Sequence, residues 1–133
     1  MYKRQAVAPA ALPATAPQEP PPLLDVRAGV AALMGDEALY RRLLVMFHER
    51  EIDFFARFRA ASEQGDGDTA MRCAHDLKSA AGTLGMPALQ RAATALEEAC
   101  RLRGEAAALE PLLQAVQRQL EPVLASLREK SLA

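Results

Sequence analysis

The sequence predicts an all-α protein, an antiparallel up-down four-helix bundle with a short additional N-terminal helix. Half of the 133 residues are apolar, many of them alanine, and only 5% are aromatic. Closely packed helices tolerate this composition, whereas a sheet would need more β-branched and aromatic residues. From residue 25 onward, apolar residues recur at three- and four-residue steps in segments separated by turns. This is the period of amphipathic helices, and four long ones joined by short turns favour an antiparallel bundle.

Residues 1–22 are expected to form a linker that precedes a bundle domain at residues 23–133. The segment is rich in alanine and proline and includes the run Pro20-Pro21-Pro22. Proline removes backbone donors and favours extended polyproline II conformation, which predicts a semi-rigid, largely disordered linker. Such a linker implies that the domain is tethered to something upstream. A proline-rich binding motif is less favoured, because basic residues flank the segment only at its start.

Two helices are expected before the centre of the chain. Asp25 is placed to cap a short helix that ends near Gly35, and Asp36 to cap a long helix that continues to about Gln64. The charged run at residues 48–51 interrupts the apolar stripe of the long helix and predicts a bend there. That stripe consists of Leu39, Leu43, Met46, Phe47, Phe54 and Phe58.

The next helix is expected over about residues 68–84. It follows a turn at residues 65–68, in which Asp66 or Asp68 is placed to cap it, and it ends at Gly85. Two more helices follow. Their expected inward faces are Leu89, Ala93, Leu96 and Cys100 in the first, and Leu112, Val116, Leu120, Val123 and Leu127 in the second.

Proline positions fit the last two predicted helices differently. Pro87 suits the first turn of a helix that reaches about Arg103. The last helix, at about residues 109–130, accepts Pro111 in its first turn. Pro122 lies in its interior, where it removes one backbone hydrogen bond and is expected to bend the helix.

Composition excludes several classes of function. The net charge of −1 gives no reason to expect a nucleic-acid partner. No apolar run reaches eighteen residues, so no membrane contact is expected. Cys73 and Cys100 make neither a disulfide framework nor a zinc site, which indicates a reducing cytoplasm. His48 has no supporting constellation and is expected to be a solvated residue on a helix surface.

The chain is organised around residues 74–85. In a helix, Ala74, Leu77, Ala81 and Leu84 form a core face. His75 lies about 200° around the helix from Leu77, so it points to solvent on the far side. The residues that share its face are Lys78, Ser79 and Gly82. This arrangement presents an imidazole to another macromolecule on a rigid, exposed helix face.

The string His-x-Leu-Lys-[Gly/Ser]-x-x-Gly-x-x-Gly, here His75 to Gly85, resembles the signature of histidine-containing phosphotransfer (HPt) domains. Ser79 stands where that family most often has glycine, and small residues there are an accepted variant. The resemblance extends over roughly residues 23–130. The further matching positions are Leu24-Asp25, Gly29, Gly35-Asp36, Leu39-Tyr40, Phe47, Gly65-Asp66, Leu89 and Leu96-Glu97.

The resemblance implies a phosphorelay reaction. The phospho-aspartate of a response-regulator receiver domain passes its phosphoryl group in line to His75, which passes it to another receiver aspartate. The domain is then a phosphoryl carrier and not an enzyme by itself. It needs no cofactor or metal of its own, because the receiver supplies the Mg²⁺. We expect a cytoplasmic monomer that contacts neither membrane nor nucleic acid. The proline-rich start favours the C-terminal piece of a larger hybrid sensor kinase, and a free-standing carrier with a disordered tail would have the same sequence pattern.

The residues around His75 fit that role. An imidazole near pH 7 is largely neutral and has a nucleophilic nitrogen. Lys78, one turn on, offers a positive charge to phosphoryl oxygens, and Arg72 on the other side is a candidate for partner docking. Ser79 and Gly82 leave room for a partner. Glycine in a helix costs about 1 kcal/mol relative to alanine, so its presence suggests access rather than stability. Gln90, in the following helix, is placed to reach toward the same site.

Two alternatives remain open from the sequence alone. The segment from His75 to Ser79 also resembles the phosphoacceptor box of histidine-kinase dimerisation hairpins. Against that reading, Ala80 replaces the expected proline, and no ATP-binding motif follows. The second alternative is a non-catalytic interaction bundle in which His75 is incidental.

Overall fold

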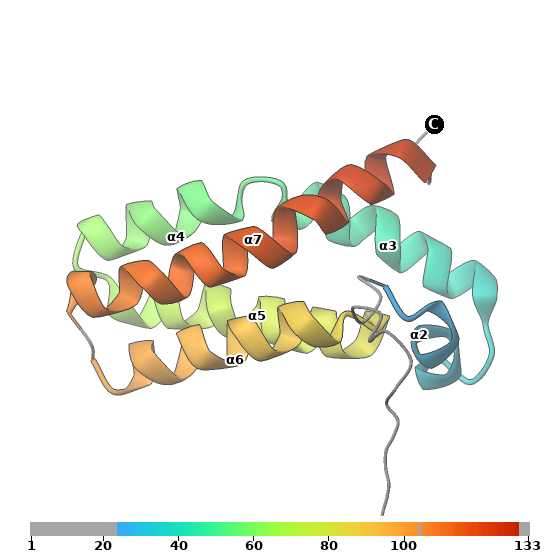
Figure 1. Cartoon of the computed structure of the whole chain (residues 1–133), viewed down its shortest axis with the longest axis horizontal. Coiled ribbons are helices and arrows are strands. Elements are labelled where there is room, and N and C mark those ends of the chain that lie inside the picture. Colours follow the sequence, from blue (N-terminus) through green and yellow to red (C-terminus); the bar gives the residue numbers. More distant parts are fainter. Residues whose placement is uncertain (1–23, 104, 131–133) are drawn as a thin grey trace, which may run out of the picture.

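The computed structural model describes residues 24–103 and 105–130, which form six helices and no strand. The helices are α2 (Val26–Ala32), α3 (Glu37–Glu51), α4 (Phe54–Glu63), α5 (Gly67–Leu84), α6 (Pro87–Arg101) and α7 (Ala106–Lys130). In Figure 1, α3 and α4 follow one another along one edge, while α5, α6 and α7 run alongside in alternating directions. The short α2 lies at the end where α3 begins and α5 ends. The predicted bundle with an additional N-terminal helix is therefore confirmed.

Two further predictions concern the N-terminal linker and membrane-spanning segments. The linker predicted at residues 1–22 falls outside the described residues, so its conformation stays a prediction. Within the described ranges, no helix combines the length and the apolarity that crossing a membrane requires.

The single long helix predicted to run to Gln64 is in fact two helices. α3 ends at Glu51 and α4 begins at Phe54, at the end of the charged run where we expected a bend. Arg57 holds this break together. Its guanidinium donates hydrogen bonds to the Glu51 and Asp53 carboxylates and to the backbone carbonyl of Arg50, each at 2.8 Å. The Arg57 side chain thus satisfies a carbonyl at the end of α3 and neutralises a buried carboxylate.

The inner face of α3 is rotated from the predicted one. Met46 is 53% exposed and Leu43 is only half-buried, whereas Tyr40 and Leu44 lie in the core. His48, expected in solvent, is 8% exposed, and Glu51 is 2% exposed. Their positions explain the error. Leu44, Phe47, His48 and Glu51 follow the i, i+3, i+4, i+7 pattern of one helix face, so the charged run continues the buried stripe. Burial raises the pKa of the Glu51 carboxyl, and the neighbouring Arg57 opposes that rise.

α5 lies at the centre of the bundle, where it packs against α2, α3, α4 and α6. Its N-terminus is capped by Asp66, whose carboxylate accepts hydrogen bonds from the Thr69 backbone and hydroxyl. Both bonds lower the pKa of the Asp66 carboxyl, and the bond from the Thr69 hydroxyl has the larger effect. The buried face of α5 consists of Ala70, Ala74, Leu77, Ala81 and Leu84. The core face predicted for this helix is therefore confirmed.

The last two helices close the core. α6 buries Leu89, Ala93 and Leu96 as predicted, and Cys100 is half-buried against the core. α7 begins three residues before the predicted start and continues as one helix through Pro122. Leu112 is only half-buried, and its neighbour Leu113 takes the core position. The buried face of α7 is Leu109, Leu113, Val116, Leu120, Val123 and Leu127.

α2 locks the C-terminal end of α5. The backbone N–H of Asp25 donates to the carbonyl of Gly85 at 2.6 Å, and the buried Tyr40 hydroxyl donates to the carbonyl of Leu84 at 2.7 Å. Gly85 is left-handed, with φ of +81°, and a Cβ there would lie 2.2 Å from the carbonyl oxygen of Asp25. A Cβ at Gly29 would lie equally close to the Tyr40 ring. Backbone meets backbone at this junction, which fixes the position of α5 relative to α2.

We predict that Gly85→Ala destabilises the protein more than Gly35→Ala. Both glycines have positive φ, but a Cβ at Gly35 would meet nothing within 4 Å. Gly35→Ala therefore reports left-handed strain alone, about 1 kcal/mol, whereas Gly85→Ala adds a backbone clash and should cost about 3 kcal/mol or more. Urea denaturation followed by circular dichroism measures both. Equal losses would contradict the proposed lock.

Candidate functional site

His75 lies near the middle of α5 on the face opposite the core. Its side chain is 52% exposed, whereas Ala74 and Leu77 beside it have no exposed surface. The helical period predicted this orientation. A rigid helix held on its inner side by four other helices therefore presents the imidazole to solvent.

Glu97 of α6 contacts His75 and Lys78 at once. One carboxylate oxygen, Oε2, lies 2.8 Å from His75 Nδ1, and the other, Oε1, lies 2.7 Å from Lys78 Nζ. The Glu97 side chain is 17% exposed, so these contacts are partly shielded from water. The hydrogen bond from Lys78, followed by that from His75, holds the pKa of the Glu97 carboxyl below its usual range. Glu97 is therefore a carboxylate at neutral pH.

This geometry fixes the tautomer of the imidazole. An ionised carboxylate only accepts hydrogen bonds, so His75 Nδ1 must carry the hydrogen that it shares with Glu97. In the neutral ring, Nε2 then holds the free lone pair. Among the described residues, Nε2 has no hydrogen-bond partner. The nitrogen that is able to act as a nucleophile is thus the one that faces away from Glu97.

The other predicted residues lie around this centre. Arg72 and Ser79 are exposed on α5, on either side of His75. Gly82 is exposed as well, but the space above it is taken by the amide of Gln90, which a Cβ at Gly82 would meet at 2.6 Å. The room that we expected a partner to use over Gly82 is therefore filled by a flexible side chain of the protein itself.

A groove of about 600 Å³ lies between α3 and α5, next to His75. Its apolar lining includes Met46, and its rim carries an ion pair of 3.0 Å between Arg50 and Asp76, the residue that follows His75. Ser79 lines the groove and also lies on the His75 face. The groove residues are Leu43, Met46, Phe47, Glu49, Arg50, Glu51, Asp76, Ser79, Ala80, Thr83 and Leu84.

Sequence reasoning missed the roles of Glu97 and of this groove. A signal for Glu97 was present, because α5 and α6 are antiparallel around a turn at Met86. His75 and Glu97 each lie eleven positions from Met86, and Gly82 and Gln90 each lie four positions from it. Positions equidistant from the turn face each other, as the contacts of both pairs show. The groove had no comparable signal, because it depends on how α3 is rotated against α5.

The site contains no evident place for a metal ion. Over residues 24–103 and 105–130, three or more histidine, cysteine or acidic side chains do not gather in a way that would hold one. The two oxygens of the Glu97 carboxylate are already bonded to His75 and Lys78.

We predict that Glu97→Gln removes an acid-sensitive part of the stability. The lowered pKa of Glu97 means that the stabilisation is complete above the pKa of the unfolded carboxyl, and is lost as the pH falls through the lower pKa of the folded state. Wild type should exceed the variant by about 0.5–1 kcal/mol at pH 7, and the difference should shrink and then vanish as the pH falls through the lowered pKa of Glu97. Urea denaturation at a series of pH values measures this. A difference that stays constant across the series would show that the carboxylate is not stabilised in this way.

Comparisons with known proteins agree with this architecture. The family model described as "Hpt domain" matches residues 42–129, which include α5 and its histidine. A solved structure, the HPT domain of a sensor hybrid histidine kinase from Shewanella, superposes with a TM-score of 0.71 at 20% identity. The match covers 80% of this chain and 92% of that one, and at this identity it demonstrates a shared fold. A search of curated proteins finds no match.

The family match spans most of the bundle and contains the exposed histidine with its lysine one turn on. The Shewanella domain has the same helical fold as this chain, in agreement with the family match. The chain belongs to the Hpt family, and it is a histidine phosphotransfer domain of a two-component phosphorelay.

Proposed function

We propose that His75 is the phosphoryl acceptor, and that it receives the group on Nε2 from the phospho-aspartate of a receiver domain and passes it to another receiver aspartate. One observation carries this proposal. The imidazole is 52% exposed, with Nδ1 bound to Glu97 and the lone pair of Nε2 directed away from that carboxylate. The other histidine, His48, is 8% exposed and offers no comparable surface.

In the proposed step, one bond to phosphorus forms as another breaks. The lone pair of His75 Nε2 attacks the phosphorus, the bond from phosphorus to the aspartyl oxygen breaks, and its electron pair stays on the aspartate as a carboxylate. The ring keeps the hydrogen on Nδ1, which the Glu97 carboxylate accepts at 2.8 Å, and becomes a cation. Onward transfer reverses these changes. The pair of His75 and Glu97 resembles the histidine and carboxylate of serine hydrolases, in which the carboxylate fixes the tautomer of the imidazole.

Lys78 supports the proposal as a cation one helical turn from His75 on the same face. Its ammonium carries three donors, and its bond to Glu97 uses one of them. The remaining donors are available for phosphoryl oxygens, which favour charge-assisted hydrogen bonds. We further propose that the receiver supplies the Mg²⁺, because the site described above gathers no acidic cluster of its own.

Hpt domains work with receiver domains in phosphorelays. We propose that the receiver covers the groove between α3 and α5 as well as His75. Any partner that reaches Nε2 must lie over the adjoining surface, and Met46 offers exposed apolar area there. Ser79 lies where the groove meets the His75 face, and Arg72 extends the surface along α5. Gly82 contributes to docking if Gln90 moves aside.

Further parts of the proposal follow from this role. As a phosphotransfer carrier, the domain would act as a monomer with no ATP-dependent activity of its own, in the cytoplasm where receiver domains are found. It would bind neither nucleic acid nor membrane, and it would work within a larger hybrid kinase. The alternative of a kinase dimerisation hairpin is less well supported, because α3 to α7 bury a common core within one chain.

We predict that His75→Gln abolishes phosphorylation while the stability changes by less than about 0.5 kcal/mol. Receiver domains charged with a small phospho-donor and Mg²⁺ should label wild type with an acid-labile, base-stable group, and the variant should stay unlabelled. Labelling of the variant would disprove the assignment to His75. Labelling of wild type by ATP alone would favour the kinase hairpin, and no labelling by any donor would favour an interaction bundle.

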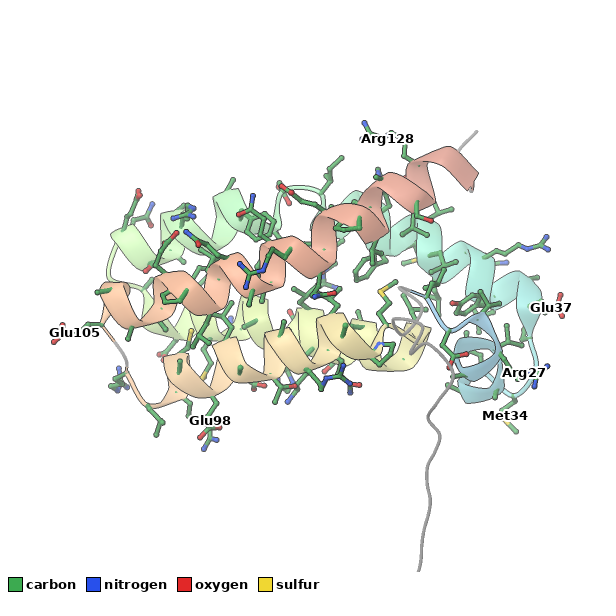
Figure 2. The ribbon with its side chains drawn as sticks, viewed as in Figure 1. Arg27, Met34, Glu37, Glu98, Glu105 and Arg128 are labelled. Atoms are coloured by element: carbon green, nitrogen blue, oxygen red, sulfur yellow. The ribbon has the colours of Figure 1, made fainter. Side chains whose placement is uncertain are left out.

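We predict that Met46→Asp slows transfer from the receiver by about tenfold or more, because a charge would be buried in the apolar groove. Met34→Asp is the matched control. Met34 is 96% exposed and lies beside α2 at one end of the bundle, as Figure 2 shows. The transfer rate at limiting domain concentration measures both. Equal effects of the two changes would place the receiver away from the groove.

A further inference from the structure

We propose that Glu97 shortens the lifetime of the phosphohistidine, so that the domain acts as a rapid intermediate in the relay rather than as a store of phosphoryl groups. This inference rests on the proposed function, because it concerns His75 after Nε2 has accepted the phosphoryl group. Glu97 is a positioning residue in this account. It touches Nδ1 and Lys78 but neither the phosphorus nor Nε2.

The first argument is competition for Lys78. Its ammonium lies one helical turn from His75 on the same face, and Glu97 holds it at 2.7 Å. An ammonium shared with a carboxylate neutralises phosphoryl oxygens less than a free one does. The carboxylate also lies on the same small face as the phosphoryl group and repels it. Both effects favour loss of the phosphoryl group.

The second argument concerns the proton on Nδ1. In a phosphorylated imidazole, the bond between phosphorus and Nε2 breaks more easily when Nδ1 is protonated, because the ring then leaves as neutral imidazole. The Glu97 carboxylate at 2.8 Å holds that proton in place. The other charged groups facing this region are Lys78, Asp76 and Arg72 on α5 and Arg50 on α3, which is paired with Asp76. Of the two carboxylates described in this region, Asp76 pairs with Arg50, whereas Glu97 is bonded to the ring.

The step that Glu97 favours is balanced. Water, or an aspartate of the receiving domain, attacks the phosphorus as the bond to Nε2 breaks. The electron pair of that bond returns to Nε2, and the ring passes from a cation to a neutral imidazole that keeps its hydrogen on Nδ1. When water attacks, it loses one proton to solvent and inorganic phosphate is released.

The test compares wild type with Glu97→Gln, which keeps the shape of the side chain and removes its charge. Glu98→Gln is the matched control, the same change on the exposed next residue, whose carboxylate pairs with Arg101. Each protein is phosphorylated with phosphoramidate, without a receiver, and loss of the phosphohistidine is followed by ³¹P NMR at pH 8. Glu97→Gln should lengthen its half-life about fivefold, the size of one partly exposed charge interaction, and Glu98→Gln should not.

A pH profile separates this role from a merely structural one. Between pH 6 and 8, the loss rates of wild type and Glu97→Gln should differ most at pH 8 and converge toward pH 6. Adding Lys78→Met to Glu97→Gln should remove part of the gain in lifetime. Equal lifetimes of wild type and Glu97→Gln, or parallel pH profiles, would overturn the inference. Because phosphoramidate acts without a receiver, that result would leave transfer from a receiver to His75 untouched.

Discussion

The close approach of α5 and α6 is the constraint on which the site depends. These two helices share the most extensive contact in the described bundle, and fully buried alanines, Ala74, Ala81 and Ala93, lie in this region. Small side chains permit a short distance between helix axes. At that distance the carboxylate of Glu97 reaches both His75 and Lys78 from the neighbouring helix. The packing thereby determines the tautomer of the imidazole.

The rest of the bundle keeps the reactive helix in place. Asp25, just before α2, donates to the carbonyl of Gly85 just after α5, and Tyr40 of α3 donates to the carbonyl of Leu84. Arg57 fastens the break between α3 and α4. From the same region, Arg50 reaches Asp76 beside His75, which ties the end of α3 to the reactive part of α5. Figure 2 shows the charged side chains of Glu98 on α6 and Glu105 just before α7 extending away from the bundle. A residue on a helix supported in this way is held more precisely than one on a loop.

The sequence predicted the helices, the core face of α5 and the orientation of His75, because these follow from the helical period alone. It failed for His48, which was expected in solvent, and the charged run was taken to interrupt the apolar stripe although the spacing of His48 and Glu51 continued it. It also left Glu97 without a role, because that role depends on the register between two helices. The filling of the space over Gly82 by Gln90 depends on the same register and on a side-chain conformation that no local pattern encodes.

The most direct test of the account is the site of phosphorylation within the imidazole ring. We would measure ¹H–¹⁵N and ¹⁵N–³¹P correlations for the protein labelled with ¹⁵N in histidine, before and after transfer from a receiver. His48, buried in α3, is the internal reference. The account predicts that His75 carries hydrogen on Nδ1 before transfer and that phosphorus couples to its Nε2 afterwards. Coupling to Nδ1 of His75, or to either nitrogen of His48, would contradict it.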